Sequence, residues 1–172
     1  MKKIMVAGVS AGAGKSTFAR KLGEGSGIPV HHLDSYYWKP GWVEAEEAEF
    51  RAAQEELVEG ENWIIEGNYT STFDIRLARA DTFIYLELPL AVCIYRVLKR
   101  WLTNKGRTRP DMAEGCPEKM DFAFLKFIIT TYSARRVKMR QHMRDFLQAH
   151  PDHRVIFLAN QKQIGGFLRS VK

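Results

Sequence analysis

The fold of this chain is decided by the stretch Gly8-Val9-Ser10-Ala11-Gly12-Ala13-Gly14-Lys15-Ser16-Thr17. A short apolar run, residues 4–7, precedes it and is typical of a buried parallel strand. After it, residues 17–22 combine helix-forming side chains with apolar positions at helical spacing. A glycine-rich turn between a strand and a helix is the context in which the order Gly-Lys-Ser binds phosphate. The sequence therefore predicts a phosphate-binding loop here.

Each residue type in this loop has a chemical role toward a bound triphosphate. Glycines let consecutive backbone N–H groups turn toward one oxyanion, and the start of a helix adds free N–H groups and partial positive charge. Lys15 is expected to reach the terminal phosphates, and the Ser16 hydroxyl to bind the Mg²⁺ ion that bridges them. The residues predicted in this way to bind ATP are Gly12, Ala13, Gly14, Lys15, Ser16 and Thr17.

The first part of the loop departs from the usual spacing. Five residues separate Gly8 from Gly14, whereas the usual pattern has about four. Counting back from Lys15 therefore places Val9 where the first glycine is expected. We expect the extra residue near Val9 and Ser10 to bulge away from the phosphates without moving Lys15. A chance glycine-rich turn is the plainer alternative, but the flanking strand and helix favour phosphate binding.

Length and composition indicate one domain without a membrane span. The chain has 172 residues, of which 45% are hydrophobic and 27% charged, as is ordinary for a globular protein. No apolar run approaches the roughly eighteen residues of a transmembrane helix, and nothing resembles a signal peptide. Cys93 and Cys116 form no metal-binding or secreted-type pattern. We expect a single domain over residues 1–172, cytoplasmic, with free thiols, as a monomer or homodimer.

The formal charge of +6 is unevenly distributed along the chain. Residues 44–66 contain nine glutamates and one arginine, whereas residues 96–109 and 135–144 contain lysines and arginines without any acid. Basic clusters of this kind suit nucleotide phosphates or a nucleic-acid backbone. For residues 135–144, a solvated helix face is the plainer explanation.

Apolar runs that alternate with helical patterns indicate an α/β fold. Strands are predicted over residues 4–7, 29–33, 63–65, 82–86 and 154–158. Helices are predicted over residues 17–23, 45–58, 73–80, 90–103, 118–149 and 164–171, with a break near Tyr132 and Ser133 because the fifth is too long for an ordinary helix. Such strands form a parallel sheet covered on both faces, and ligands bind beyond their carboxyl ends. The loops expected to matter hold Lys15, Asp34, Glu66, Glu87 and Asn160.

Two further strand ends connect the chain to a known family. With the phosphate loop, His32-Leu33-Asp34-Ser35-Tyr36-Tyr37 and Ile65-Glu66-Gly67-Asn68-Tyr69 make the chain resemble the adenylate-kinase-like P-loop kinases. More narrowly, it resembles bacterial DNA topology modulation (FlaR-type) proteins, also through Trp38-Lys39-Pro40-Gly41-Trp42 and Thr108-Arg109-Pro110-Asp111. The resemblance runs nearly end to end. It implies a three-layer α/β sandwich of P-loop NTPase type, with a five-stranded parallel sheet in the order 2-3-1-4-5 and a small helical lid over about residues 103–120.

The resemblance also assigns roles to residues at the strand ends. Asp34 matches the aspartate that faces the acceptor hydroxyl in uridine kinases, as a base or a positioning group; capping of its own turn is the alternative. Glu66 is expected to contact Mg²⁺ through water or to orient the acceptor, unless it is only a satisfied acid at the strand end. The residues predicted to bind the acceptor are Asp34, Tyr36, Trp38, Glu66, Asn68 and Tyr69. The aromatic rings would stack on a nucleobase or, equally, close one end of the core.

The basic residues between 96 and 109 match the lid arginines of these kinases. Arg96 and Arg100 are four residues apart on a helix and therefore project from one face. Arg107 and Arg109 lie in a segment rich in glycine and proline, so they would reach the site when a lid closes. Forked guanidinium groups stabilise charge on a transferring phosphoryl group, although a solvated basic segment is the alternative. The predicted catalytic residues are Lys15, Asp34, Arg96, Arg100, Arg107 and Arg109.

Together these features predict an ATP-dependent kinase that moves the γ-phosphoryl group to a small acceptor, a nucleoside or nucleotide. Asn160, Gln161 and Lys162, after the last strand, match positions that contact adenine in relatives. Mg²⁺ arriving with ATP is the only metal expected, because Cys116 stands alone in the lid and the histidines form no ligand set. The alternatives are a DNA-binding regulator of topology with an ATP site, which lacks a recognisable nucleic-acid module, and an NTPase without an acceptor. No membrane partner is expected.

Overall fold

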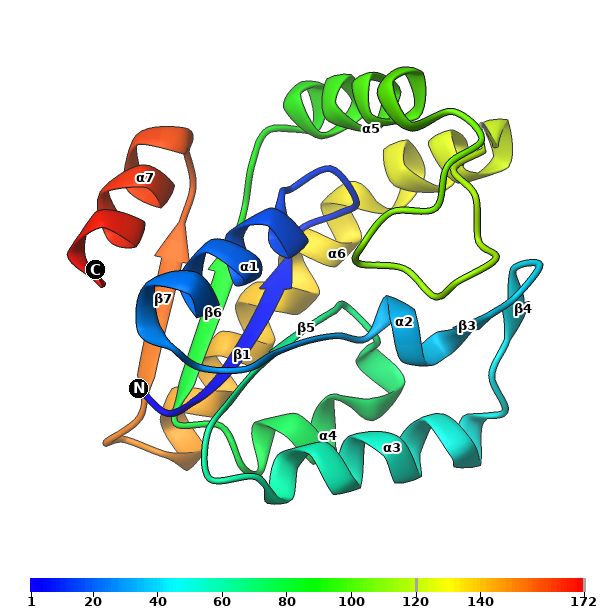
Figure 1. Cartoon of the computed structure of the whole chain (residues 1–172). Helices are drawn as coiled ribbons and strands as arrows, with labels where there is room; N and C mark the ends of the chain where they lie inside the picture. Colours follow the sequence, from blue (N-terminus) through cyan, green and yellow to red (C-terminus); the bar gives the residue numbers. More distant parts are fainter. Residues whose placement is uncertain (120, 172) are drawn as a thin grey trace.

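Five parallel strands form the central sheet of the protein, shown as a computed structural model in Figure 1, which describes residues 1–119 and 121–171. The sheet has the order β2-β5-β1-β6-β7. Its strands are β1 (Lys3–Gly8), β2 (Val30–His32), β5 (Trp63–Glu66), β6 (Thr82–Leu86) and β7 (Arg154–Leu158). Counted along the chain within this sheet, the order is 2-3-1-4-5, so the predicted topology is confirmed. Met120, the last residue of the predicted lid, and Lys172 lie outside the described residues.

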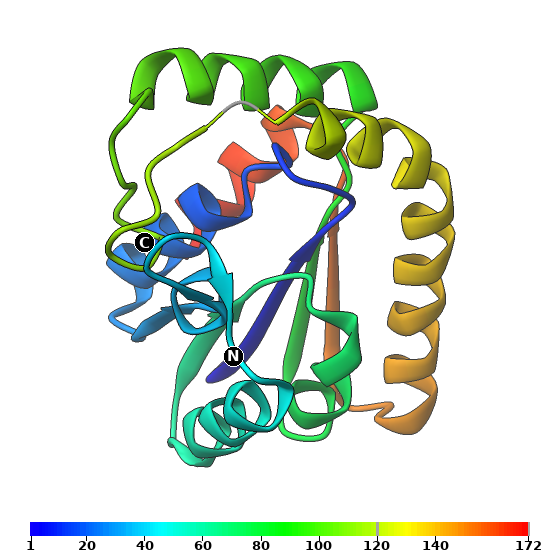
Figure 2. The ribbon, with the colours of Figure 1, turned by 90° about the vertical axis from the view of Figure 1, so that its right-hand side faces the viewer.

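Helices cover both faces of this sheet, which makes the predicted three layers. On one face lie α1 (Lys15–Ser26) and α7 (Gln161–Ser170), while α6 (Phe122–Ala149) runs along the other (Figure 2). Near the lower end of the view in Figure 1, α3 (Glu47–Glu59) packs against α4 (Phe73–Leu77), which follows the 3-10 turn η1 (Thr70–Thr72). Above the arrowheads of the strands lies α5 (Leu90–Asn104) (Figure 1). No helix of the described residues is both long and apolar enough to cross a membrane.

The central strands read as continuous apolar runs because both of their faces are covered. All residues of β5 and β6 are buried, as are all residues of β1 after Lys3. In β1, Ile4, Met5 and Val6 have no exposed surface. Burying such side chains on both faces of a strand is worth roughly 1.5–3 kcal/mol for each one. The strands therefore hold their carboxyl ends, and the loops that follow, in fixed relative positions.

The segment after β2 is more structured than the loop that its sequence predicts. A short helix, α2 (Asp34–Tyr37), is followed by an antiparallel pair of two-residue strands, β3 (Trp38–Lys39) and β4 (Val43–Glu44). A Pro-Gly turn connects them, and its tip has Gly41 at φ 80° and Trp42 at φ 65°. Strands of two residues are too short to show a periodicity in the sequence.

The predicted break in the helix near Tyr132 and Ser133 is wrong, because α6 runs unbroken over 28 residues. Its first turns curve (Figure 2). The Thr130 hydroxyl donates to Lys126 O at 2.9 Å and the Thr131 hydroxyl to Phe127 O at 2.6 Å. Such bonds back to the preceding turn bend a helix without ending it. Further along, buried residues such as Met139 and Phe146 hold α6 to the sheet.

Candidate active site

A cavity of about 1410 Å³ lies at the carboxyl ends of the sheet strands, lined by the phosphate loop, α5, the predicted lid and the α2–β3 segment. This volume exceeds the range of about 300–1,000 Å³ usual for one small ligand, so it has room for two. The sequence-predicted residues that line it are Gly12, Ala13, Gly14, Lys15, Ser16, Thr17, Asp34, Trp38, Asn68, Tyr69, Arg96, Arg100 and Arg109. The lining residues do not include Tyr36, Glu66, Arg107 and Asn160.

The phosphate loop connects β1 to α1 with a backbone that suits a bound anion. Gly12 and Gly14 have φ angles of 77° and 88°, which only glycine adopts without strain. A Cβ atom on Gly12 would lie 2.2 Å from Cys93 O, so the start of α5 also requires glycine there. No side chain caps the first turn of α1. Its backbone N–H groups therefore face the cavity without intrahelical partners, as a phosphate site requires.

The longer first part of the loop does not protrude. Val9 and Ser10 have no exposed surface. The backbone N–H of Val9 donates to Leu86 O at 2.9 Å, which continues the pairing of β1 with β6. Val9 thus takes the place of the usual first glycine as a core residue, and at this position the chain continues the strand instead of forming the expected bulge.

Lys15 and Glu66 face each other beside the phosphate loop. Lys15 Nζ lies 3.9 Å from Glu66 Oε1, and the Glu66 side chain is 3% exposed. On the other side, His32 Nδ1 lies 3.0 Å from Glu66 Oε2. Burial acts to lower the pKa of His32, but the hydrogen bond and charge of Glu66 outweigh burial and raise that pKa above its ordinary value. His32 thus fixes the Glu66 carboxylate, a role that the sequence did not indicate.

These groups also suit a Mg²⁺ ion carried by a nucleotide. Among residues 1–119 and 121–171, no three or more His, Cys, Asp or Glu side chains gather as a metal site. Mg²⁺ bound with ATP takes only one or two protein ligands and completes its shell with phosphates and water. The Ser16 hydroxyl lines the cavity, and the Glu66 carboxylate lies behind Lys15. Both are oxygen ligands of the kind that Mg²⁺ prefers.

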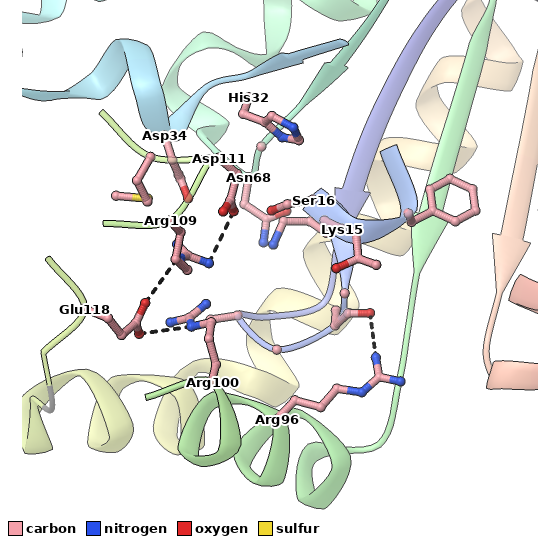
Figure 3. Close-up of a pocket in the computed structure, with 18 of the residues that line it drawn as sticks. Lys15, Ser16, His32, Asp34, Asn68, Arg96, Arg100, Arg109, Asp111 and Glu118 are labelled. Atoms are coloured by element: carbon pink, nitrogen blue, oxygen red, sulfur yellow. Dashed lines mark hydrogen bonds and ion pairs between the residues drawn. The ribbon is translucent and has the colours of Figure 1, made fainter. Parts of the chain in front are cut away.

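Asp34 begins α2 and points into the cavity (Figure 3). The Tyr69 hydroxyl donates to Asp34 Oδ1 at 2.7 Å. The Tyr69 ring in turn packs against Tyr37, at 4.7 Å, and Phe50, at 4.8 Å, measured between ring centroids. Burial and, next, the charge of Glu66 raise the pKa of the Asp34 carboxyl above its ordinary value. An oriented carboxylate with a raised pKa has the properties of a general base.

Asn68 and Arg76 hold the loop that follows β5. The Asn68 side chain both accepts from Gly8 N, at 2.9 Å, and donates to Gly8 O, at 2.8 Å, so its amide clamps this loop to the end of β1. Arg76 is fully buried and donates to Gly67 O at 2.9 Å and to Tyr69 O at 2.8 Å. Burial lowers the pKa of Arg76 to about 9, which leaves it charged at neutral pH. The sequence did not single out Arg76, because an arginine in a short helix usually lies on the surface.

Two of the predicted lid arginines meet at a single carboxylate, as Figure 3 shows. Arg100 Nε lies 3.0 Å from Glu118 Oε1, and Arg109 Nε lies 3.0 Å from Glu118 Oε2. Arg109 Nη1 also lies 3.2 Å from Asp111 Oδ2. Glu118 is 8% exposed. The sequence did not indicate Glu118, and the only available signal was its place just after the acid-free basic run.

Removing the Glu118 carboxylate should destabilise the predicted lid. In a Glu118→Ala variant, two partly buried guanidinium groups would lie together with Asp111, beside Arg109, as their one remaining carboxylate partner. We expect the free energy of unfolding to fall by about 3 kcal/mol, the lower end of the cost of breaking a buried ion pair. Chemical denaturation measures this loss, and hydrogen exchange over residues 105–119 should become faster. Glu114→Ala, an exposed acid in the same segment, is the matched control; equal effects of the two variants would contradict the bridging role.

The predicted lid is joined to the β3–β4 hairpin. Gly41 N donates to Gly115 O at 3.0 Å, and Trp42 Nε1 donates to Pro117 O at 3.1 Å. Lys119 Nζ lies 5.3 Å from the centre of the Trp42 ring, within cation–π distance. The segment that follows α5 at Asn104 is a loop tied across itself by isolated bridges, one of them between Lys105 and Glu118.

Arg96 lies beside the phosphate loop, on the face of α5 that it shares with Arg100. Arg96 Nη1 donates to Ala13 O at 3.4 Å, and Nη2 donates to Gln161 Oε1 at 2.8 Å. Gln161 also lines the cavity. Arg96 is therefore placed to contact a nucleotide bound on the loop.

Three predicted site residues lie elsewhere. Arg107 is exposed and outside the cavity lining. Asn160 caps α7, because its side chain accepts from Gln163 N at 2.9 Å. The Tyr36 hydroxyl lies 3.1 Å from His31 Nδ1, away from the cavity. For these three residues, the sequence placed the side chain near the site but could not show its direction.

Solved structures of several kinases that act on small molecules have a fold similar to that of this chain. Shikimate kinase from Bacteroides thetaiotaomicron is 21% identical, with a TM-score of 0.55 over 98% of this chain and 94% of that one. Gluconokinase from Sinorhizobium meliloti 1021 is 15% identical, with a TM-score of 0.53 over 99% and 89%. Deoxyadenosine kinase from M. mycoides, solved with bound dATP, is 16% identical, with a TM-score of 0.52 over 99% of both chains.

At these identities the likeness establishes the fold, and the chain has the P-loop kinase fold. No protein-family profile matches the chain. No curated protein sequence matches it either. The narrower resemblance to DNA topology modulation proteins therefore stays a prediction.

Proposed function

We propose that this protein is an ATP-dependent phosphotransferase that moves the γ-phosphoryl group to a hydroxyl of a small acceptor. One observation carries the proposal: a single cavity contains a phosphate loop with Lys15, the carboxylate of Asp34 and the guanidinium groups of Arg96, Arg100 and Arg109. Phosphoryl transfer depends mainly on positioning and on stabilising negative charge. The groups in this cavity are those that such a reaction requires toward the phosphate donor and toward the acceptor.

Different side chains would act on ATP and on the acceptor. The N–H groups of the loop and Lys15 would bind the triphosphate, and Arg96 would lie against its outer part. Ser16, and Glu66 through water, would hold Mg²⁺, which supplies neutralisation of phosphate charge when it is bound. Asp34, oriented by Tyr69, would accept the proton of the attacking hydroxyl.

We further propose that the whole chain is one domain with a lid over about residues 103–120. In this structure Arg100 and Arg109 are paired with Glu118, and Arg109 is also paired with Asp111. A bound triphosphate offers these arginines another anion, so it would compete with Glu118 and draw Arg109 toward the transferring group. The cavity would then be shielded from water, which limits hydrolysis without an acceptor.

The aromatic lining of the cavity favours an acceptor with a flat ring, as in a nucleoside or nucleotide. The ring centroids of Trp38 and Trp42 lie 5.4 Å apart on the β3–β4 hairpin, and both residues line the cavity. Phe124 and Phe127 line it as well. Indole and phenyl faces stack on any base, which supports binding without fixing base identity.

A screen of ADP release with a panel of nucleosides, nucleotides, sugars and hydroxy acids tests this proposal. We expect at least one acceptor to raise ADP release about tenfold or more over the rate without acceptor, with a phosphorylated product visible by ³¹P NMR. Equal ADP release with and without every acceptor would instead support an NTPase. Duplex DNA belongs in the same screen, because salt-sensitive binding with a sequence preference would favour the DNA-binding alternative.

A further inference from the structure

A second cavity of about 290 Å³ opens beside the main one. Asn68, Thr70 and Arg135 line both cavities and therefore form the boundary between them. The remaining walls of the second cavity come from α6, namely Thr131, Ala134, Lys138 and Met139. We call it the side cavity. Its volume is just below the range of about 300–1,000 Å³ that holds a whole small ligand, so it suits one functional group of a larger molecule.

Arg135 is the distinctive residue of the side cavity. Its guanidinium carbon lies 4.4 Å from the centre of the Phe127 ring, which holds the planar group in place. Arg135 is partly buried, and burial lowers its pKa. In the part of the chain that the structure describes, neither Arg135 nor Lys138 lies within ion-pair distance of a carboxylate. A partly buried cation without a counter-ion is unfavourable unless a ligand supplies one.

Among the neighbouring α6 arginines that the structure describes, Arg140 has a carboxylate partner, whereas Arg136 and Arg144 have none but are exposed to solvent. Arg140 Nε donates to Glu87 Oε2 at 2.8 Å. Arg144 donates to the side chain of Gln141, one turn before it on the exposed face. The prediction of a solvated basic helix face over residues 135–144 therefore holds for only some of these residues. Arg135 faces the cavities, and Arg140 is paired with Glu87 at the end of β6.

We propose that the side cavity is an anion subsite, in which Arg135 binds a carboxylate or phosphate group of the acceptor. This inference rests on the proposed function and narrows its substrate class to acceptors that carry a negative charge in addition to the reacting hydroxyl. The described lining of the side cavity contains arginine and lysine and no acid. A guanidinium fork matches the two oxygens of either anion, and the Thr70 hydroxyl adds a donor beside it.

The position of the side cavity agrees with this role. Asn68, on its boundary, is clamped to Gly8, where the phosphate loop begins. Thr70 follows Tyr69, whose hydroxyl holds Asp34. An acceptor anchored at Arg135 would therefore extend past Tyr69 toward Asp34 and Lys15, with its hydroxyl near the transferring group. Lys138 is exposed and would attract the anion at the outer rim.

Direct binding of a simple anion tests the subsite without relying on kinase activity. Inorganic phosphate and, separately, acetate are titrated by calorimetry into Lys15→Ala protein, whose phosphate loop is weakened. We expect further replacement Arg135→Gln to weaken binding of the preferred anion about ten- to a hundredfold, the usual worth of a charged hydrogen bond. Arg144→Gln in the same background is the matched control and should leave binding unchanged. The preferred anion tells whether phosphate or carboxylate is recognised.

Two outcomes would overturn the subsite. One is equal binding in the Arg135→Gln and Arg144→Gln proteins; the other is no binding of either anion up to ~50 mM while Arg135 is present. The Arg135→Lys variant is a control for misfolding, because it keeps the positive charge and should retain part of the anion affinity. Thermal melting verifies that each variant is folded. Failure here, with acceptor-dependent ADP release intact, would reject the subsite and leave the proposed function standing.

With an acceptor in hand, kinetics give a second readout. Arg135→Gln should raise the KM of an anionic acceptor about ten- to a hundredfold, with a smaller change in kcat and no change in the KM of ATP. The KM of a neutral analogue, in which an amide or hydroxyl replaces the anion, should not change. A uniform loss with both acceptors would contradict the assignment.

Discussion

Replacement of Lys15 with alanine is expected to lower kcat for phosphoryl transfer by about 10²–10³-fold and to weaken ATP binding. The Lys15 side chain is 14% exposed, and its ammonium lies 3.9 Å from Glu66 Oε1. Without that ammonium, the buried Glu66 carboxylate would face the triphosphate directly. The variant therefore loses one attractive interaction and gains a repulsive one, both in a site partly shielded from water.

Calorimetry with Mg²⁺-ATP and steady-state kinetics separate the two effects. Lys99→Ala, an exposed lysine on α5, is the control and should behave like the unmodified protein. Thermal melting should change little in the Lys15→Ala variant, because Glu66 keeps His32 as its closer partner at 3.0 Å. Unchanged ATP affinity in the Lys15→Ala variant would show that the phosphate loop is wrongly assigned.

The elements that the sequence predicts well are those whose signal is local. The runs over β1, β5 and β6 are apolar because each strand is buried on both faces, so their place in a parallel sheet follows from composition alone. The loop from Gly12 to Thr17 is similar, because glycines at positive φ and a lysine at a helix start leave a recognisable spacing. Val9 shows the limit of spacing, since a buried valine continues the strand where a glycine was expected.

The residues that sequence reasoning missed act through partners that are distant along the chain. Glu118 matters because Arg100 and Arg109 both reach it, and Arg76 because it meets the carbonyls of Gly67 and Tyr69. The residues that flank Glu118 and Arg76 in the sequence do not indicate these contacts. The direction of a side chain is equally hidden, which is why Asn160 turned out to cap a helix.

Replacement of Asp34 with asparagine is expected to lower kcat by about 10²–10⁴-fold, the usual contribution of a general base. Asparagine keeps an oxygen that can accept from the Tyr69 hydroxyl, so the loops should retain their positions. The variant removes only the ability to take a proton and the negative charge beside Glu66. Asp152→Asn, at an exposed turn before β7, is the matched control and should leave turnover unchanged.

The dependence on pH distinguishes a base from a mere hydrogen-bond acceptor. Because burial and Glu66 raise the pKa of Asp34, the carboxylate needed for catalysis is lost as the pH falls through this raised value. The kcat/KM of the unmodified protein for its acceptor should therefore fall on the acid side at a pH above the ordinary range of an aspartate, whereas the residual kcat/KM of Asp34→Asn should lack that limb.

The same raised pKa predicts that Asp34→Asn makes the free protein more stable. A carboxyl group whose pKa is higher in the folded than in the unfolded protein contributes most to stability at low pH, where it is protonated in both the folded and the unfolded protein. This contribution to the free energy of unfolding is lost as the pH rises through the folded-state pKa. At neutral pH the Asp34 carboxylate is therefore a cost, which the neutral amide removes. We expect a higher melting temperature at pH 7, with a difference that vanishes in acid. A variant that keeps full turnover and an unchanged melting temperature would exclude Asp34 as the base.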